Sequence, residues 1–349
     1  MSKKEKWING IILAVCTLVT IGIFVNNDDI DQFPKLMRNT NFTYVWCAIV
    51  AMLLYVIFNG MVIKLSADYL KQNITFLQAV YVAFVGQYYS LVTPFASGGQ
   101  PFQIYTMRSQ YQIPIAKGTS ITMQKCLIYQ IIVPIMILLS YLLNFNMLKE
   151  TYPQYFVVIS VAVFINMLGT VPVVLLIYNI KWLVVLTKAI CKGLKKIRLF
   201  RKLDAEKIIN GIWEYDHAIQ ELKSSHGLWL KTSLITILQM VIYFSIPYLL
   251  FRALGAENIS FIKSVCLQVI VYCVVSYIPT PGNAGASEGA FYVIYGAFLS
   301  SHILSFCMLL WRLITYYFML GISGFVVVSQ YLIVGSRKES VELNEQEYT

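Results

Sequence analysis

The chain has 349 residues, of which 58% are hydrophobic and only 13% are charged, and its formal net charge is +10. This composition is too apolar for a soluble enzyme or a nucleic-acid-binding domain, and it predicts an all-α polytopic membrane protein. Seven scattered cysteines without CxxC spacing are typical of small buried residues, so we expect no disulfide framework, no metal site and no cofactor.

Six apolar runs reach the roughly 20 residues that a membrane-spanning helix needs. The first, about residues 7–25, has no clear cleavage site after it, and we interpret it as a retained signal-anchor helix. The other five predicted spans are about 42–64, 118–143, 155–180, 231–252 and 303–331.

Two further apolar stretches, about 76–107 and 260–300, are broken at their centres. The first contains TPFASGGQPF (Thr93 to Phe102) and the second contains TPGNAGASEGAF (Thr280 to Phe291). Each arm has about 12–17 residues, which is short for a full crossing. The arms therefore form either re-entrant helical hairpins or pairs of short tilted spans. A bilayer tolerates such backbone only where protein or a water-filled cavity covers it.

The distribution of basic residues supports this topology. With the N-terminus placed inside, the cytoplasmic segments hold 20 of the 27 Lys and Arg residues, and the outer loops hold five. Short cytoplasmic loops collect basic residues. We therefore expect both termini to be cytoplasmic.

A long insert, residues 181–230, lies on the predicted cytoplasmic side. Its first part is strongly basic, and its second part predicts an amphipathic helix that begins after Asp204 and ends near Gly227. The lysines either bind an anionic inner leaflet or merely follow the rule for cytoplasmic loops. The tail, 336–349, is polar and predicts disorder.

The two halves of the chain, 1–150 and 151–335, read alike: span, span, broken pair, span. Three crossings per half turn the second half upside down, which predicts the inverted repeat of alternating-access transporters. Thr93-Pro94 corresponds to Thr280-Pro281, and Gln100 corresponds roughly to Glu288. Lys125 lies 31 residues after Pro94, and Arg312 lies 31 residues after Pro281.

Lys125 and Arg312 are the strongest candidates for substrate binding. Both lie within predicted spans, and charges at such depth usually face a cavity on a substrate path. The alternative is that they snorkel or pair internally. Two positive sites stacked across the membrane suit a phosphate-bearing lipid headgroup that passes from one leaflet to the other.

The two turns add further candidates for the same site. Helix N-termini and close glycine backbone can hold a phosphate oxygen, although the glycines can also serve close helix packing alone. The candidate residues of the turns are Ser97, Gly98, Gly99, Gln100, Asn283, Gly285 and Ser287. Glu288 either pairs with Arg312, binds an amine of the substrate or carries a proton.

The paired motifs LVTPFASGGQPFQIY and YIPTPGNAGASEGAF resemble the lysylphosphatidylglycerol synthase transmembrane family. This is the flippase region of the multiple peptide resistance factor, a factor of antibiotic resistance, together with its stand-alone relatives. The resemblance implies that the turn residues match the family's motif, with Asn283 standing where many relatives have glycine. The residues expected to shape the turns are Pro94, Pro101, Pro279, Pro281, Gly282 and Gly289.

The expected function is a lipid flippase of a bacterial cytoplasmic membrane. Its substrate would be a phospholipid, an aminoacyl-phospholipid or a phosphate-linked glycolipid. An ion-coupled transporter of a small anion is the alternative. The lysyltransferase activity in the family's name is disfavoured, because the soluble transferase domain of full-length members is absent from this sequence, and we expect no enzyme activity. The expected partners are membrane lipids, a separate lipid-modifying enzyme or a second copy of the chain, and no nucleic acid.

Overall fold

The structure is a computed structural model, and every regular element in the part of the chain that it describes is a helix. The described residues are 33–93, 96–194, 205–223, 225–278, 280–283 and 285–329. The predicted first span, the predicted N-cap Asp204, the tail, Pro94 and Pro279 lie outside these stretches.

Five helical stretches of the described chain are long and apolar enough to cross a membrane. The first, α3 (Phe42–Tyr69), has 28 residues and is about 42 Å long at 1.5 Å per residue. The others are α6 (Ile115–Leu143), α8 (Pro153–Tyr178), α11 (His226–Phe244) with α12 (Ile246–Ala253), and α15 (Ser301–Arg312) continuing through η5 (Leu313–Phe318) to Ser329. These are the five predicted spans that fall within the described residues.

Each broken segment forms two helices that pack against each other. The first consists of α4 (Phe76–Val92) and α5 (Gly99–Tyr111). The second consists of α13 (Phe261–Val275), a short turn η4 (Pro281–Asn283) and α14 (Ala286–Tyr295).

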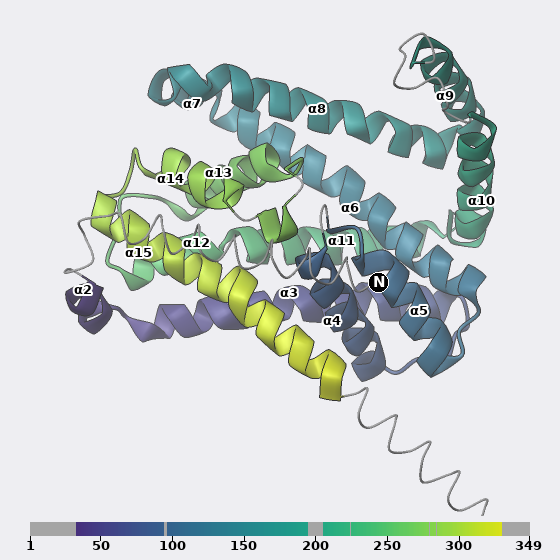
Figure 1. The fold of residues 1–349 in the computed structure, drawn as a ribbon, viewed down its shortest axis with the longest axis horizontal. Helices are drawn as coiled ribbons and strands as arrows, with labels where there is room; N and C mark the ends of the chain where they lie inside the picture. Colours follow the sequence, from purple (N-terminus) through teal and green to yellow (C-terminus); the bar gives the residue numbers. More distant parts are fainter. Residues whose placement is uncertain are drawn as a thin grey trace, which may run out of the picture.

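The two broken segments occupy different ends of the bundle. In Figure 1, α4 and α5 lie toward the end that holds α9 (Ile180–Leu194) and α10 (Ala205–Lys223), whereas α13 and α14 lie toward the end that holds α2 (Phe33–Asn39). Nevertheless α4 contacts η4, so the turn of the second segment reaches the first segment.

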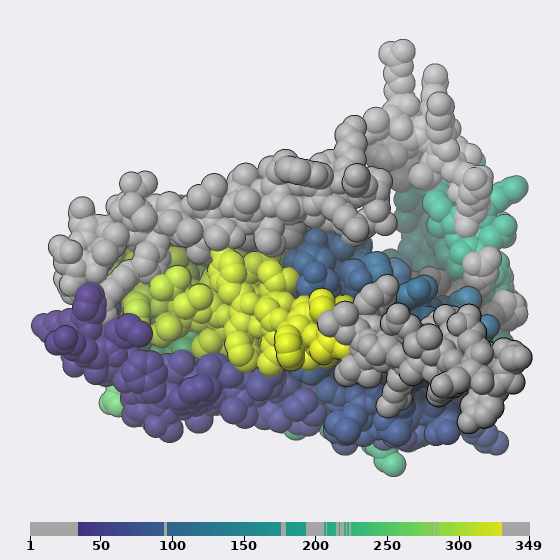
Figure 2. Space-filling model, turned by 60° about the horizontal axis from the view of Figure 1, so that its bottom comes forward, coloured from purple at the N-terminus to yellow at the C-terminus, as the bar shows by residue number. Residues whose placement is uncertain are grey.

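The long helices of the two halves pack directly on each other. Helix α3 contacts α4, α11 and α12, and its Ala51, Met52 and Val56 lie in the shared core. Figure 2 shows the C-terminal helix (yellow) lying along α3 (purple), in agreement with the contact between η5 and α3. The region between the broken segments is therefore enclosed by helices from both halves.

The insert forms two helices, α9 and α10, and the second lies in the stretch where an amphipathic helix is predicted. Leu222 is fully buried, and Ile212 packs against a small cluster made by Met123, Leu127 and Leu183. The indole of Trp229 donates a hydrogen bond to the Leu222 carbonyl at 2.9 Å. The apolar side of α10 is therefore held against α6, α8 and α9. The short helices α2 and α7 (Phe145–Thr151) were not predicted.

Candidate functional site

A cavity of about 440 Å³ lies where the two broken segments meet. Its wall includes residues of α3, α4, α5 and α6 from the first half, and residues of α11, α13, η4 and η5 from the second. Ser97, Gly99 and Gln100 reach it from the first turn, and Gly282 and Asn283 reach it from the second. Lys125 and Arg312 both line this one cavity.

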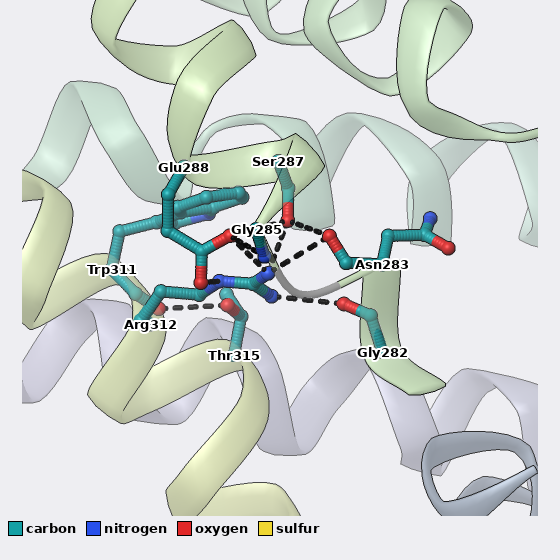
Figure 3. Close-up of polar contacts among 8 residues, drawn as sticks. All are labelled: Gly282, Asn283, Gly285, Ser287, Glu288, Trp311, Arg312 and Thr315. Carbon is teal, nitrogen blue, oxygen red and sulfur yellow. Dashed lines mark hydrogen bonds and ion pairs between the residues drawn. The ribbon is translucent and has the colours of Figure 1, made fainter. Parts of the chain in front are cut away.

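The second turn depends on backbone conformations that few residues adopt. Gly282, Asn283 and Gly285 all have positive φ angles, of 58°, 52° and 84°. Asparagine is the residue that, after glycine, most readily takes such a conformation, which explains why Asn283 is compatible with this turn. A side chain at Gly282 would also overlap the ring of Tyr316. These conformations direct the carbonyls of Gly282 and Asn283 toward Arg312 (Figure 3).

Arg312 is almost completely satisfied by partners within the protein. Its Nε and Nη2 donate to the two carboxylate oxygens of Glu288 at 2.7 and 2.8 Å, which makes a bidentate ion pair. Its Nη1 donates to the carbonyl of Gly282 at 3.1 Å, and Nη2 also contacts the carbonyl of Asn283 and the hydroxyl of Ser287 (Figure 3). Both charged side chains are buried, with 5% of Arg312 and 1% of Glu288 exposed.

Glu288 also caps the N-terminus of the helix that follows the turn. Its Oε2 accepts the backbone N–H of Gly285 at 2.8 Å, which completes a capping interaction at the start of α14. Ser287 donates to the Asn283 carbonyl at 2.7 Å. Of the three roles considered for Glu288, the ion pair with Arg312 is the one present in the structure. The N-terminus of α14 is therefore already bound by the Glu288 carboxylate.

Lys125 has a different environment. Its ammonium donates to the side-chain oxygens of Gln103 at 2.7 Å and of Asn59 at 3.2 Å, and both partners are neutral amides. No acidic side chain pairs with it among the residues that the structure describes. The side chain lies in the α6 span, where a charge is costly without compensation. The cavity thus contains one ammonium whose charge the described chain does not neutralise.

The first turn is tightly packed but less saturated than the second. The amide N–H of Gly98 donates to the hydroxyl of Thr93 at 2.9 Å, and a side chain at Gly99 would meet the Gly86 carbonyl at 2.9 Å. Among the residues that the structure describes, no side chain caps the start of α5. The first amides of a helix have no partner within that helix, so those of Gly99 and Gln100 can donate to a ligand in the cavity.

The remaining predicted residues have modest roles. The amide of Gln100 lies 3.8 Å from the sulfur of Cys126. Pro101 is exposed in the first turn of α5, where proline disrupts no helical hydrogen bond. Pro281 begins η4, and Gly289 lies exposed within α14.

Sequence reasoning missed the two partners of Lys125. Asn59 lies within α3, and an amide in such an apolar span is the signal that could have identified it. Gln103 is buried on α5, and it has space because its neighbour on α4 is Gly86, where a Cβ would overlap the Gln103 side chain. A group of aromatic side chains, Tyr55, Tyr129, Tyr243, Phe244 and Tyr272, completes the wall, and the hydroxyls of Tyr129 and Tyr272 are hydrogen-bonded to each other.

The last helix changes its winding next to Arg312. Residues Leu313–Phe318 form a π-helical segment between α15 and the final turns. Such segments are rare, and they are frequent at functional sites. This one places Thr315 and Tyr316 on the cavity wall beside Arg312.

The two glycines around Glu288 are expected to respond oppositely to alanine. Neither added Cβ would meet an atom within 4 Å. Gly285 has a φ of 84°, so Gly285→Ala forces a left-handed conformation and should cost about 1–2 kcal/mol of the free energy of unfolding. Gly289 is inside a helix, so Gly289→Ala should raise that free energy by about 0.5–1 kcal/mol. Thermal unfolding of the detergent-purified variants measures both, and equal shifts would contradict the geometry of the turn.

Comparison with known proteins gives two matches. The family model described as "Lysylphosphatidylglycerol synthase TM region" matches residues 7–323. A UPF0104 membrane protein of Archaeoglobus fulgidus is 24% identical over 269 residues, which are 73% of this chain and 76% of that protein. The matched family region contains both turns, Lys125, Glu288 and Arg312.

Proposed function

Since the chain belongs to the lysylphosphatidylglycerol synthase transmembrane family and is a multi-pass membrane protein, we propose that it moves a lipid with a phosphate-bearing headgroup between leaflets. The observation that carries this proposal is the ammonium of Lys125, which lines the cavity and has only amide oxygens as partners. A lipid phosphate would supply the missing negative charge and would form charge-assisted hydrogen bonds.

The proposed route is built from an inverted repeat. The two broken hairpins enter from opposite ends of the bundle, and their turns meet at the cavity between the halves (Figure 1). In each half, the span that follows the broken hairpin carries the cation, and that cation bonds to the second arm of the hairpin: Lys125 to Gln103, and Arg312 to Glu288. Transporters with inverted repeats bind their substrates at such interfaces, and rocking of one repeat against the other exposes the site alternately.

The cations of the two halves then have different roles, one in substrate binding and one in the structure of the turn. In the second half, the carboxylate of Glu288 neutralises Arg312, so this pair fixes the shape of the turn. In the first half, a neutral amide replaces the carboxylate and leaves the charge of Lys125 for the substrate. The headgroup therefore binds beside Lys125 and the backbone N–H groups at the start of α5. Arg312 remains paired with Glu288 and holds the second turn in place on the cavity wall.

The proposed orientation of the protein in the membrane rests on the distribution of basic residues. We place it in a bacterial cytoplasmic membrane with both termini, α9 and α10 on the cytoplasmic side, because the segments assigned to that side by the predicted topology hold 20 of the 27 Lys and Arg residues. Its partners are lipids of phospholipid, aminoacyl-phospholipid or phosphate-linked glycolipid type. A separate lipid-modifying enzyme that produces the substrate, or a second copy of the chain, is a further proposed partner. We assign the chain a transport role and no enzyme activity.

Liposomes reconstituted with the purified full chain test this function against transport of a small anion. One arm measures the loss of inner-leaflet fluorescent phosphatidylglycerol after a quencher is added outside, and the other measures uptake of inorganic phosphate. We expect lipid translocation above that of protein-free liposomes and no phosphate uptake. Phosphate uptake without lipid movement would favour the small-anion transporter, and liposomes inactive in both arms would contradict the proposal.

A further inference from the structure

A second cavity of about 440 Å³ lies beside α6. Residues of α6, α8, α9 and α10 line it. Its wall is apolar, and the residues that define its shape include Leu127, Pro172, Leu183, Ile208 and Ile212. No charged side chain lines it among the residues that the structure describes.

The two cavities meet at α6. Cys126 and Gln130 line both of them, and Cys126 directly follows Lys125 in the chain. Gln130 is five residues beyond Lys125, which is about 7.5 Å along the helix axis. A polar compartment with an uncompensated ammonium thus adjoins an apolar compartment with no charge, and the join lies within two helical turns of that ammonium.

We propose that the apolar cavity between α6, α8 and the α9–α10 insert holds one acyl chain of the lipid whose headgroup binds at Lys125. This inference rests on the proposed function. A molecule that occupies both compartments must be charged at one end and apolar at the other, with the two parts covalently joined over a short distance, as in a phospholipid. The insert is then the part of the protein that guides a lipid tail while its headgroup is inside the bundle.

The physical role of such a cavity is to provide a route for the chain. An acyl chain that leaves the bilayer for an apolar pocket exchanges one apolar environment for another, so it gains little from the hydrophobic effect. What it avoids is contact with the polar wall around Lys125. Filling the pocket should therefore weaken the binding of a lipid with full-length chains by steric exclusion, and it should leave a chain-free headgroup unaffected.

Gly211 of α10 provides the means to fill the pocket. It lines the apolar cavity, and a Cβ built on it would meet no atom within 4 Å. A Gly211→Phe side chain can therefore enter the open space, and phenylalanine is a better helix former than glycine. Gly211→Ala is the matched control, because it makes the same change to the backbone but adds only one methyl group.

The experiment compares the binding of two probes to the detergent-purified full chain. Dioleoylphosphatidylglycerol carries both headgroup and tails, and glycerophosphoglycerol is the same headgroup without tails. We expect Gly211→Phe to weaken dioleoylphosphatidylglycerol binding about tenfold, a factor that corresponds to about 1.4 kcal/mol, and to leave glycerophosphoglycerol binding unchanged. Gly211→Ala should bind both probes as the unchanged chain does.

Each outcome bears on one of the two proposals. Unchanged binding of dioleoylphosphatidylglycerol to Gly211→Phe, or equal weakening of both probes, would overturn the acyl-chain site. Lys125→Met in the same assay should weaken both probes. If Lys125→Met binds both as tightly as the unchanged chain, or if the unchanged chain binds neither, the proposed function itself fails, independently of the result at Gly211.

Discussion

Arg312→Met is expected to lower the free energy of unfolding by about 3–5 kcal/mol, which is the range for breaking a buried ion pair from one side. The substitution leaves the Glu288 carboxylate with 1% of its residue exposed and without its cation. It also removes the donor to the carbonyl of Gly282 and one of the two donors to the carbonyl of Asn283. The second turn should therefore loosen along with the pair.

A double-mutant cycle separates the pair from other effects of the substitution. Glu288→Gln alone leaves a buried guanidinium without its anion, whereas Arg312→Met with Glu288→Gln removes both charges. We expect the double variant to be more stable than Arg312→Met alone, because it no longer contains the unpaired carboxylate that Arg312→Met leaves buried. Thermal unfolding in detergent gives the four values. Additive losses in the double variant would show that the two side chains do not act as a pair.

In contrast to Arg312→Met, Lys125→Met is expected to cause a large loss of translocation and little loss of stability. A hydrogen bond to a charged group contributes about 1.5–3 kcal/mol, so losing it should slow translocation about tenfold to a hundredfold. The free energy of unfolding should be unchanged or higher, because an ammonium without an anion is removed from the interior. Lys125→Arg keeps the charge and should retain part of the activity.

An exposed lysine provides the control for this prediction. Lys149 lies at the end of α7, away from the residues that line the cavity, and Lys149→Met removes the same charge from the protein surface. It should translocate lipid at the rate of the unchanged chain. If Lys149→Met and Lys125→Met lose activity to the same degree, net charge rather than the cavity ammonium is responsible.

The positions of the helices and breaks could be predicted because they depend on local chemistry. An apolar run of about 20 residues crosses a bilayer whatever its neighbours are, and a Thr-Pro followed by glycines stops a helix in any context. The same holds for α10, whose apolar stripe follows the helical repeat. The depth of Lys125 and Arg312 within their spans followed from counting residues along those helices.

The partners of the two cations could not be predicted, because they depend on how the helices are rotated. Successive residues on a helix point about 100° apart, so matching the two halves by sequence could not tell Gln100 from Gln103. The halves suggested Gln100 as the counterpart of Glu288, yet the structure gives Lys125 the side chain of Gln103. The π-helical segment after Arg312 likewise arises only when the elements are packed together.

The position of a bound phosphate would test most directly whether Lys125 binds the substrate while Arg312 stays paired with Glu288. An experimental structure of the full chain with dioleoylphosphatidylglycerol should show the phosphate within hydrogen-bond distance of the Lys125 ammonium and the first amides of α5, with Arg312 still paired to Glu288. A phosphate bound to Arg312 in place of Glu288, with the Lys125 ammonium making no contact to the lipid, would contradict the account.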